Sequence, residues 1–368
     1  ADLFVTEESR WNEHPDRKFW SGIAKGPGPA ALRGLLRIAS LPYSAAVRIR
    51  NRLYDWNLIT THSTQAVVVS VGNLTTGGTG KTPLVIWLAN ALIRRGLSCA
   101  ILTRGYRTSG QSLSDEPALL AKSCGGAAVI VDPNRVAGAQ KAIQDHHAQV
   151  LILDDGFQHR RLKRDLDLVA IDATCPFGFG RILPAGLLRE PVRSLRRADA
   201  VIITRYDLAN DEQINRLEAT IRKIRPNAEI FRAVHRHTHA RTFQTKSIKT
   251  ADLAGKKVFV FCGIGNPTAF LRSVESLGSI LTGKEIFNDH HVYTQSDLVK
   301  ITKQATTAGA ELILTTEKDW VKAALLIPDK SEIPLLYLTM ELEFLTCPDT
   351  IIEKIVDLAE VKFGKKPQ

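Results

Sequence analysis

Short apolar runs alternate with segments of helical periodicity over most of this chain. The runs of strand type lie at 67–71, 99–103, 127–131, 150–154, 166–171 and 200–204. Segments with the 3.6-residue period lie between several of them, such as 84–95 and 133–145. Strand–helix alternation of this kind builds a parallel sheet whose ligands gather at the carboxyl ends of the strands. The pattern therefore predicts an α/β fold.

The alternation is interrupted once, which predicts two domains. The first α/β unit is expected over 61–230. A polar and basic stretch follows, so 231–255 is predicted to be a linker. A second, smaller α/β unit is expected over 256–368, and its final helix, at 349–362, either stays there or returns to the first unit. A chain of 368 residues is long enough for two domains of ordinary size.

The N-terminal segment, 1–60, has a different pattern. Between positions 17 and 54 there are eight basic residues and no acidic one. Pro42 divides this stretch into two helical patterns, and the first places Leu32, Leu35 and Leu36 on one face. A basic amphipathic helix of this type either rests on anionic lipid or packs on the main domain with solvated arginines. The periodicity leaves both alternatives open.

Composition indicates the cellular compartment and the class of partner to expect. The five cysteines are scattered without a C-x-x-C pair, which favours a reducing compartment over a disulfide frame or a zinc site. No apolar run is long enough to span a bilayer and no signal peptide is recognised, so we expect a cytosolic or peripheral membrane protein. The net charge of +11 indicates an anionic partner, but no nucleic-acid module is recognised. The alternate histidines at 235, 237 and 239 fit an exposed strand better than a metal site, because neither carboxylate nor cysteine joins them nearby.

The strongest chemical signal lies between the first apolar run and the first helix. A run of β-branched residues is followed by a glycine cluster, and a helical segment then begins at Gly80-Lys81-Thr82. This is the layout of a phosphate-binding loop (P-loop): glycines let backbone N–H groups close around phosphates, the lysine reaches the β- and γ-oxygens, and the threonine helps hold Mg²⁺. The strict pattern requires glycine where this chain has Thr75, and Gly77 and Gly78 supply the backbone freedom instead. The predicted nucleotide contacts are Asn73, Thr76, Gly77, Gly78, Thr79, Gly80, Lys81 and Thr82.

A second signal is the carboxylate pair Asp154-Asp155, which ends a buried strand. Acids often cap strands, but in order and spacing with the loop they predict a site for Mg²⁺ and a nucleoside triphosphate. The metal is expected to take oxygen ligands from Thr82, a carboxylate of this pair, phosphate and water. The sequence thus predicts a P-loop NTPase-like sheet domain, a second α/β domain and an N-terminal amphipathic segment.

Several ordered motifs resemble the tetraacyldisaccharide 4'-kinase family, which phosphorylates the lipid A precursor on the cytoplasmic face of the Gram-negative inner membrane. The motifs are Gly72-Asn73 with Gly77 to Pro83, Thr103-Arg104-Gly105-Tyr106, Asp115-Glu116-Pro117, Asp154 to His159, Pro184 to Pro191, and Thr316-Glu317-Lys318-Asp319. The resemblance runs from about Val67 to Asp319. It implies ATP and Mg²⁺ as cofactors and transfer to the 4'-hydroxyl of an acylated glucosamine disaccharide 1-phosphate. It also favours peripheral attachment to an anionic membrane, because the acyl chains of the substrate must stay in lipid.

The resemblance also suggests roles for individual side chains. Lys81 stabilises charge on the transferring phosphoryl group. Thr82 and Asp154 are the expected metal ligands, with Asp155 or Glu190 as further candidates. Asp115 is the expected base, with His290 as its partner from the second domain. The structural alternatives are a helix cap for Asp115 and a surface position for His290. Arg104, Gln158, His159 and Arg189 are expected to contact phosphate or substrate.

A different class of protein shares the same nucleotide core. Switch ATPases of the partitioning and metallochaperone type have a lysine at the position that Thr76 occupies here. The absence of that lysine favours the kinase.

Overall fold

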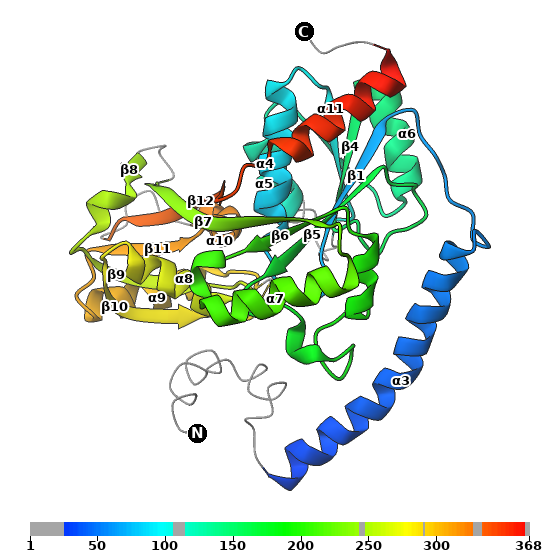
Figure 1. The fold of residues 1–368 in the computed structure, drawn as a ribbon. Helices are drawn as coiled ribbons and strands as arrows, with labels where there is room; N and C mark the ends of the chain where they lie inside the picture. Colours follow the sequence, from blue (N-terminus) through cyan, green and yellow to red (C-terminus); the bar gives the residue numbers. More distant parts are fainter. Residues whose placement is uncertain (1–25, 106–114, 243–246, 290, 327–332, 365–368) are drawn as a thin grey trace.

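The described strands form one large mixed sheet. The computed structural model describes residues 26–105, 115–242, 247–289, 291–326 and 333–364. The strand order is β10-β9-β11-β12-β7-β6-β5-β1-β4-β2-β3, with β8 paired to β7 (Figure 1). The bounds are β1 Val67–Gly72, β2 Cys99–Thr103, β3 Ala128–Val131, β4 Val150–Asp154, β5 Leu166–Asp172, β6 Ala200–Thr204, β7 Glu229–Arg241, β8 Ser247–Lys249, β9 Lys257–Cys262, β10 Ile280–Ile286, β11 Leu312–Thr316 and β12 Leu335–Phe344.

The pairing confirms the predicted α/β class. Strands β1 to β6 pair in parallel, with β1 between β4 and β5. Strands β9 to β12 also pair in parallel, and β7 joins this set by antiparallel pairing with β12. Strands β1, β2, β4, β5 and β6 are buried throughout, as expected for parallel strands covered on both faces.

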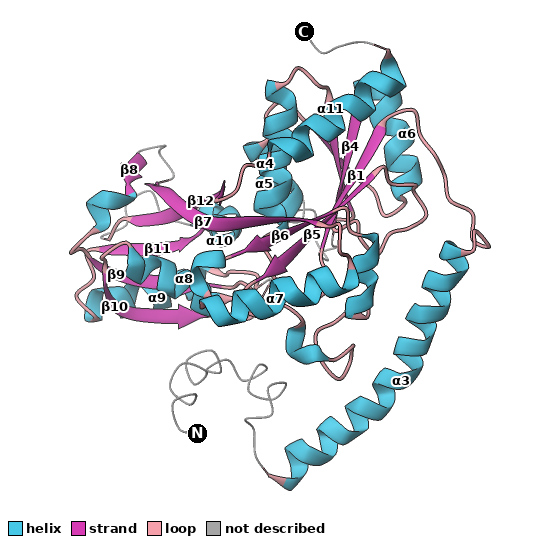
Figure 2. Cartoon of the chain, in the orientation of Figure 1, coloured by secondary structure: helices cyan, strands magenta, loops and turns pink. Residues whose placement is uncertain are grey.

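Helices cover both faces of the sheet, as Figure 2 shows. Helices α4 and α11 share one apolar cluster with β1, β4 and β5, while α6 packs on the opposite face of β1, β2 and β4. We call the part of the molecule that contains β1 to β6 the first half and the part that contains β8 to β12 the second half. In the second half, α8 and α9 pack on opposite faces of β9 and β11. The helix bounds are α3 Pro27–Asp55, α4 Lys81–Arg94, α5 Asp115–Ser123, α6 Arg135–His146, α7 Asp211–Ile224, α8 Pro267–Ser276, α9 Gln295–Thr307, α10 Glu317–Ala323 and α11 Asp349–Phe363.

The predicted linker at 231–255 is wrong over residues 231–241 and again at β8, which pairs with β7. Residues 231–241 belong to β7, whose start pairs in parallel with β6 and whose remainder pairs with β12. One 13-residue strand therefore carries the sheet from one half of the molecule into the other. The polar residues that suggested a linker, 235–239, are consecutive, and their side chains point alternately to the two faces of this strand.

The final helix returns to the first half of the molecule, which settles an alternative that the sequence left open. Ile351, Ile352 and Ile355 of α11 are buried in the cluster that α4 and β1 form. The ammonium group of Lys362 donates to the carbonyl of Ala66 at 3.0 Å and to Asp165 Oδ2 at 2.8 Å.

Helix α3 is one continuous helix of 29 residues, so the predicted break at Pro42 is wrong. Pro42 is exposed, and water can satisfy the carbonyl group that its missing N–H leaves open. Only Val47 and Asn51 are buried within α3, and Figure 1 shows its first turns projecting away from the sheet. Its exposed large apolar side chains are Leu32, Leu35, Ile38, Leu41, Tyr43 and Ile49. Within the described part of the chain, no helix combines the length and apolar character required to cross a bilayer.

Candidate active site

A cavity of about 740 Å³ lies where the carboxyl ends of β1, β2 and β4 meet the second half of the molecule. The first half contributes the phosphate-binding loop, residues 103–105 and the Asp154-Asp155 pair. The second half contributes residues 264–266, Asp289 and residues 316–318. The carboxyl edge of a parallel sheet is where α/β folds bind ligands, so this cavity is the candidate active site.

Side chains from neighbouring strands hold the phosphate-binding loop in shape. Asn73 Nδ2 donates to Thr79 Oγ1 at 2.8 Å. The hydroxyl of Thr204, at the end of β6, donates to the carbonyl of Thr79 at 2.9 Å. Arg205 Nη1 donates to the carbonyl of Gly78 at 2.9 Å. The loop therefore has a preformed backbone, and α4 begins at Lys81 with its N-terminus at the cavity, where anions bind favourably.

Gly80 is required by geometry at the start of α4. Its φ of +83° lies in the left-handed region, which disfavours side chains. A Cβ atom there would lie 2.7 Å from Nε2 of His235, which projects from β7. The Nε2 atom of His235 is buried and has no hydrogen-bond partner in the described structure. The glycine thus permits β7 to pack directly against the loop.

Lys81, Asp155 and Arg189 form a charged cluster on the cavity wall. Lys81 Nζ lies 3.3 Å from Asp155 Oδ1, and Arg189 Nη1 donates to Asp155 Oδ2 at 2.6 Å. Burial alone would raise the pKa of Asp155, but the two cations hold it below its ordinary value. Asp155 is therefore ionised, and it positions both basic groups at the mouth of the loop.

The oxygen donors of Thr82 and Asp154 fit Mg²⁺. Both residues line the cavity beside Lys81. Asp154 is buried, with Thr103 Oγ1 donating to its Oδ2 at 3.3 Å. Within the described residues, no group of three histidine, cysteine, aspartate or glutamate side chains is arranged to hold a metal. Mg²⁺ usually takes one or two protein carboxylates together with substrate phosphates and water, so this small donor set suits it.

The structure places the predicted substrate contacts at the same cavity. Arg104, Gln158, His159 and Arg189 all line it. Gln158 also holds the loop, since its Nε2 donates to the carbonyl of Asn73 at 2.8 Å. Burial and the nearby charge of Arg135 lower the pKa of His159 to about 4, so its imidazole is neutral at pH 7.

The role predicted for Glu190 as a metal ligand is wrong. Its carboxylate is fully buried, does not line the cavity, and accepts hydrogen bonds from Asn51 and Arg197. Arg189 and Glu190 are neighbours in sequence, but their side chains point in different directions. Arg189 lines the cavity, whereas Glu190 contacts Asn51 and Arg197. Asn73 and Thr76 do not line the cavity either; they shape the loop, Thr76 through its N–H bond to the carbonyl of Leu187 at 2.8 Å.

The structure locates the predicted catalytic base, Asp115, and its partner, His290, only in part. Helix α5 begins at Asp115, but the side chain of Asp115 lies outside the described structure, as does all of His290. Two described residues near them in sequence, Pro117 and Asp289, line the cavity from opposite halves.

Three further residues contact the phosphate-binding loop or Asp154, although the sequence did not assign them to the site. Arg135, the first residue of α6, is buried and donates to the carbonyl of Asp154 at 3.1 Å. Arg205 and His235 brace the loop from β6 and β7. Arg205 directly follows a predicted strand, a position that could have marked it. His235 was noted among the alternate histidines but was expected on an exposed strand, and nothing local marks Arg135.

Comparisons with known proteins agree with the site. The chain matches the family model of tetraacyldisaccharide-1-P 4'-kinase over residues 32–359. A tetraacyldisaccharide 4'-kinase of Syntrophus aciditrophicus is 38% identical over 353 residues, covering 89% of this chain and 93% of the relative. One of Halothermothrix orenii is 35% identical over 316 residues, covering 78% of this chain and 82% of the relative.

A solved structure extends the similarity to the fold. The crystal structure of LpxK from Aquifex aeolicus in complex with ATP superposes with a TM-score of 0.67 at 26% identity, covering 89% of this chain and 99% of that one. A family match over most of the chain, with a phosphate-binding loop and its carboxylate pair at one cavity, leads to one conclusion: this chain belongs to the tetraacyldisaccharide-1-P 4'-kinase family.

Proposed function

We propose that this protein transfers the terminal phosphoryl group of ATP to the 4'-hydroxyl of an acylated glucosamine disaccharide 1-phosphate, a step of lipid A biosynthesis. The observation that carries the proposal is the convergence of Lys81, Thr82, Asp154 and Asp155 on one cavity in a chain of this family. The relatives bear the name of this kinase, and the Aquifex aeolicus structure contains ATP.

The residues of the cavity have distinct tasks in such a transfer. The loop amides and Lys81 meet the β- and γ-phosphates and stabilise the charge that grows on the transferring group. Arg189, held by Asp155, adds a second cation at the same wall. Mg²⁺ held by Thr82 and Asp154 would neutralise phosphate charge. Because these groups are positioned before the substrates arrive, little reorganisation is needed at the moment of reaction.

The acceptor hydroxyl needs a base, and we assign this task to Asp115 with His290 as its partner. Support comes from neighbouring residues, since Pro117 and Asp289 line the cavity from its two sides. A carboxylate paired with an imidazole is oriented and tuned for proton transfer.

We also assign peripheral attachment to the cytoplasmic face of the inner membrane, through α3. The side chains of Leu35, Ile38 and Ile49 are all exposed, and their spacing of 3 and 11 residues places them on one side of α3. The arginines of α3 add positive charge and the helix has no acidic residue before Asp55. Apolar side chains on a basic helix are typical of an element that rests on anionic lipid, and only its last turns are packed against the protein.

A turnover assay tests the proposed function against a switch ATPase. ATP consumption is measured with and without the detergent-dispersed acylated disaccharide 1-phosphate. A kinase should consume ATP in proportion to the acceptor supplied and should consume almost no ATP without it. Turnover that ignores the acceptor would establish the switch ATPase instead.

A further inference from the structure

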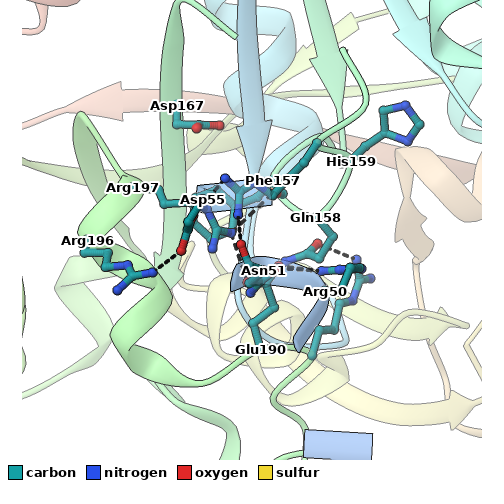
Figure 3. Close-up of polar contacts among 12 residues, drawn as sticks. Arg50, Asn51, Asp55, Phe157, Gln158, His159, Asp167, Glu190, Arg196 and Arg197 are labelled. Atoms are coloured by element: carbon teal, nitrogen blue, oxygen red, sulfur yellow. Dashed lines mark hydrogen bonds and ion pairs between the residues drawn. The ribbon is translucent and has the colours of Figure 1, made fainter. Parts of the chain in front are cut away.

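The C-terminal half of α3 is tied to the catalytic side of the molecule by a buried carboxylate. Glu190 accepts hydrogen bonds from Asn51 Nδ2 at 2.8 Å and from Arg197 Nη2 at 2.9 Å, and it pairs with Arg50 Nη2 at 3.3 Å (Figure 3). Asn51 and Arg50 belong to α3, whereas Arg197 ends the short 3-10 helix η2, Val192–Arg197. The carboxylate thus joins two elements that are far apart in sequence.

The carboxylate at the centre of this joint is fully enclosed, although Arg50 is partly exposed. Glu190 has no exposed surface, and the guanidinium of Arg197 lies over the ring of Phe157 at 4.3 Å from its centroid. Burial alone would raise the pKa of Glu190, but Arg197 and the hydrogen bonds from Asn51 and Ser194 hold it below its ordinary value. Removing one hydrogen-bond donor from a buried carboxylate destabilises the folded protein. We therefore expect Asn51 and Arg197 to be held firmly against Glu190.

The preceding residue faces the phosphate site. The N–H of Arg189 donates to the carbonyl of Leu74 at 2.8 Å, and its own carbonyl accepts from Tyr43 Oη of α3 at 3.3 Å. Its guanidinium contacts Asp155 at 2.6 Å, and Asp155 contacts Lys81 at 3.3 Å. A short chain of contacts therefore runs from α3 through residues 189 and 190 to the loop lysine.

We infer that Glu190 is a positioning residue for the kinase reaction: by fixing the backbone at 189–190 between α3 and η2, it keeps the Arg189 guanidinium on Asp155 and Lys81 in line with the phosphates. Helix α3 is by this inference part of the catalytic framework as well as a surface element. The inference rests on the proposed phosphoryl transfer, but not on the attachment of α3 to a membrane.

The chain offers a matched control at the same joint. Asp55, at the end of α3, pairs with Arg160 Nη2 at 2.9 Å and with Arg196. It ties the same helix to the same side of the protein, but it does not adjoin a residue that lines the cavity. A purely structural role for Glu190 predicts that Glu190→Gln and Asp55→Asn act alike once their stabilities are taken into account.

The test measures kcat and the KM for ATP with detergent-dispersed acceptor, so membrane binding does not enter. We expect Glu190→Gln to lower kcat roughly tenfold or more, because small misplacements of catalytic groups are costly, and to change the KM for ATP less than about twofold. Asp55→Asn should lower kcat less than about twofold. Because Glu190 acts through Arg189, the double variant Glu190→Gln, Arg189→Ala should be no slower than Arg189→Ala alone.

Each outcome separates the claims. Equal kcat in Glu190→Gln and the parent, or multiplied losses in the double variant, overturns the positioning role and leaves the proposed function intact. A parent that transfers nothing to the acceptor overturns the proposed function first. Should Glu190→Gln fail to fold, Asn51→Leu removes the hydrogen bond from Asn51 of α3 and retains the pairs of Glu190 with Arg197 and Arg50. It should lower kcat about threefold or more, again without adding to Arg189→Ala, and unchanged kcat overturns the inference.

Discussion

Replacing Leu35, Ile38 and Ile49 by serine should release the protein from anionic vesicles while leaving it folded. The three side chains are 64%, 66% and 58% exposed, so they contribute little to the packing of α3. They lie along one side of the helix, where a lipid surface would bury them together. The substitutions touch no residue of the cavity and none of the groups that contact Glu190.

The size of the effect follows from the exposed area. Full burial of a leucine or isoleucine side chain stabilises by about 1.5–3 kcal/mol, and somewhat over half of each side chain is available to enter lipid. Each substitution then costs about 1 kcal/mol of membrane binding at the low end, and the three together cost about 3 kcal/mol. That corresponds to a loss of about a hundredfold in vesicle affinity.

Sedimentation with vesicles of phosphatidylglycerol and phosphatidylethanolamine measures this loss. The matched control replaces three exposed valines on other elements, Val292, Val299 and Val361, by serine. The control should bind vesicles like the parent. High salt should release the parent only in part, since screening weakens the arginines and not the apolar face. Surface changes of this kind alter the free energy of unfolding by less than about 0.5 kcal/mol each.

Helix α3 does not bind lipid through this face if the α3 variant binds vesicles as tightly as the parent. The same holds if it loses thermal stability by several degrees more than the valine control, because α3 would then be a packed structural element.

Further predictions concern the loop, the base and pH. Gly80→Ala should weaken ATP binding about tenfold or more, since its Cβ would meet His235 at 2.7 Å in a left-handed backbone, whereas Gly125→Ala, which has open space, should bind ATP normally by calorimetry. Asp115→Ala should lower kcat far more than it raises the KM for ATP; a collapse of ATP affinity would make Asp115 a nucleotide or metal ligand instead. The pKa of His159 is lowered to about 4, so the unfolded chain binds the extra proton first and stability should fall as pH drops from about 6.5 to 4. Chemical denaturation should show on the order of 2 kcal/mol of this loss, absent in His159→Gln.

The sequence predicted those parts of the site in which local pattern and chemistry coincide. The strand into α4 could be located because a β-branched run, a glycine cluster and Gly80-Lys81-Thr82 follow one another without interruption. The same holds for Asp154-Asp155, since a buried parallel strand must end at the ligand edge of the sheet.

The remainder depends on contacts between distant segments. Strand β7 was mistaken for a linker because it is rich in polar residues, but two of its histidines, His235 and His237, line the cavity. Pro42 suggested a helix break, but an exposed helix tolerates the missing bond. Glu190 looked like a metal ligand beside Arg189, and only the packing of Asn51 and Arg197 shows that it faces the other way.

The most direct test of the central claim is the fate of the label from γ-labelled ATP. The purified protein is incubated with this ATP, Mg²⁺ and the acylated disaccharide 1-phosphate in detergent, and the lipid product is separated and its phosphate position assigned by phosphorus NMR. We expect one labelled phosphate at the 4'-position of the lipid. With folded Lys81→Ala, lipid labelling should fall roughly a hundredfold, which is the scale for the loss of one such contact. Label recovered only as inorganic phosphate, or lipid labelled equally well by Lys81→Ala, would contradict this expectation.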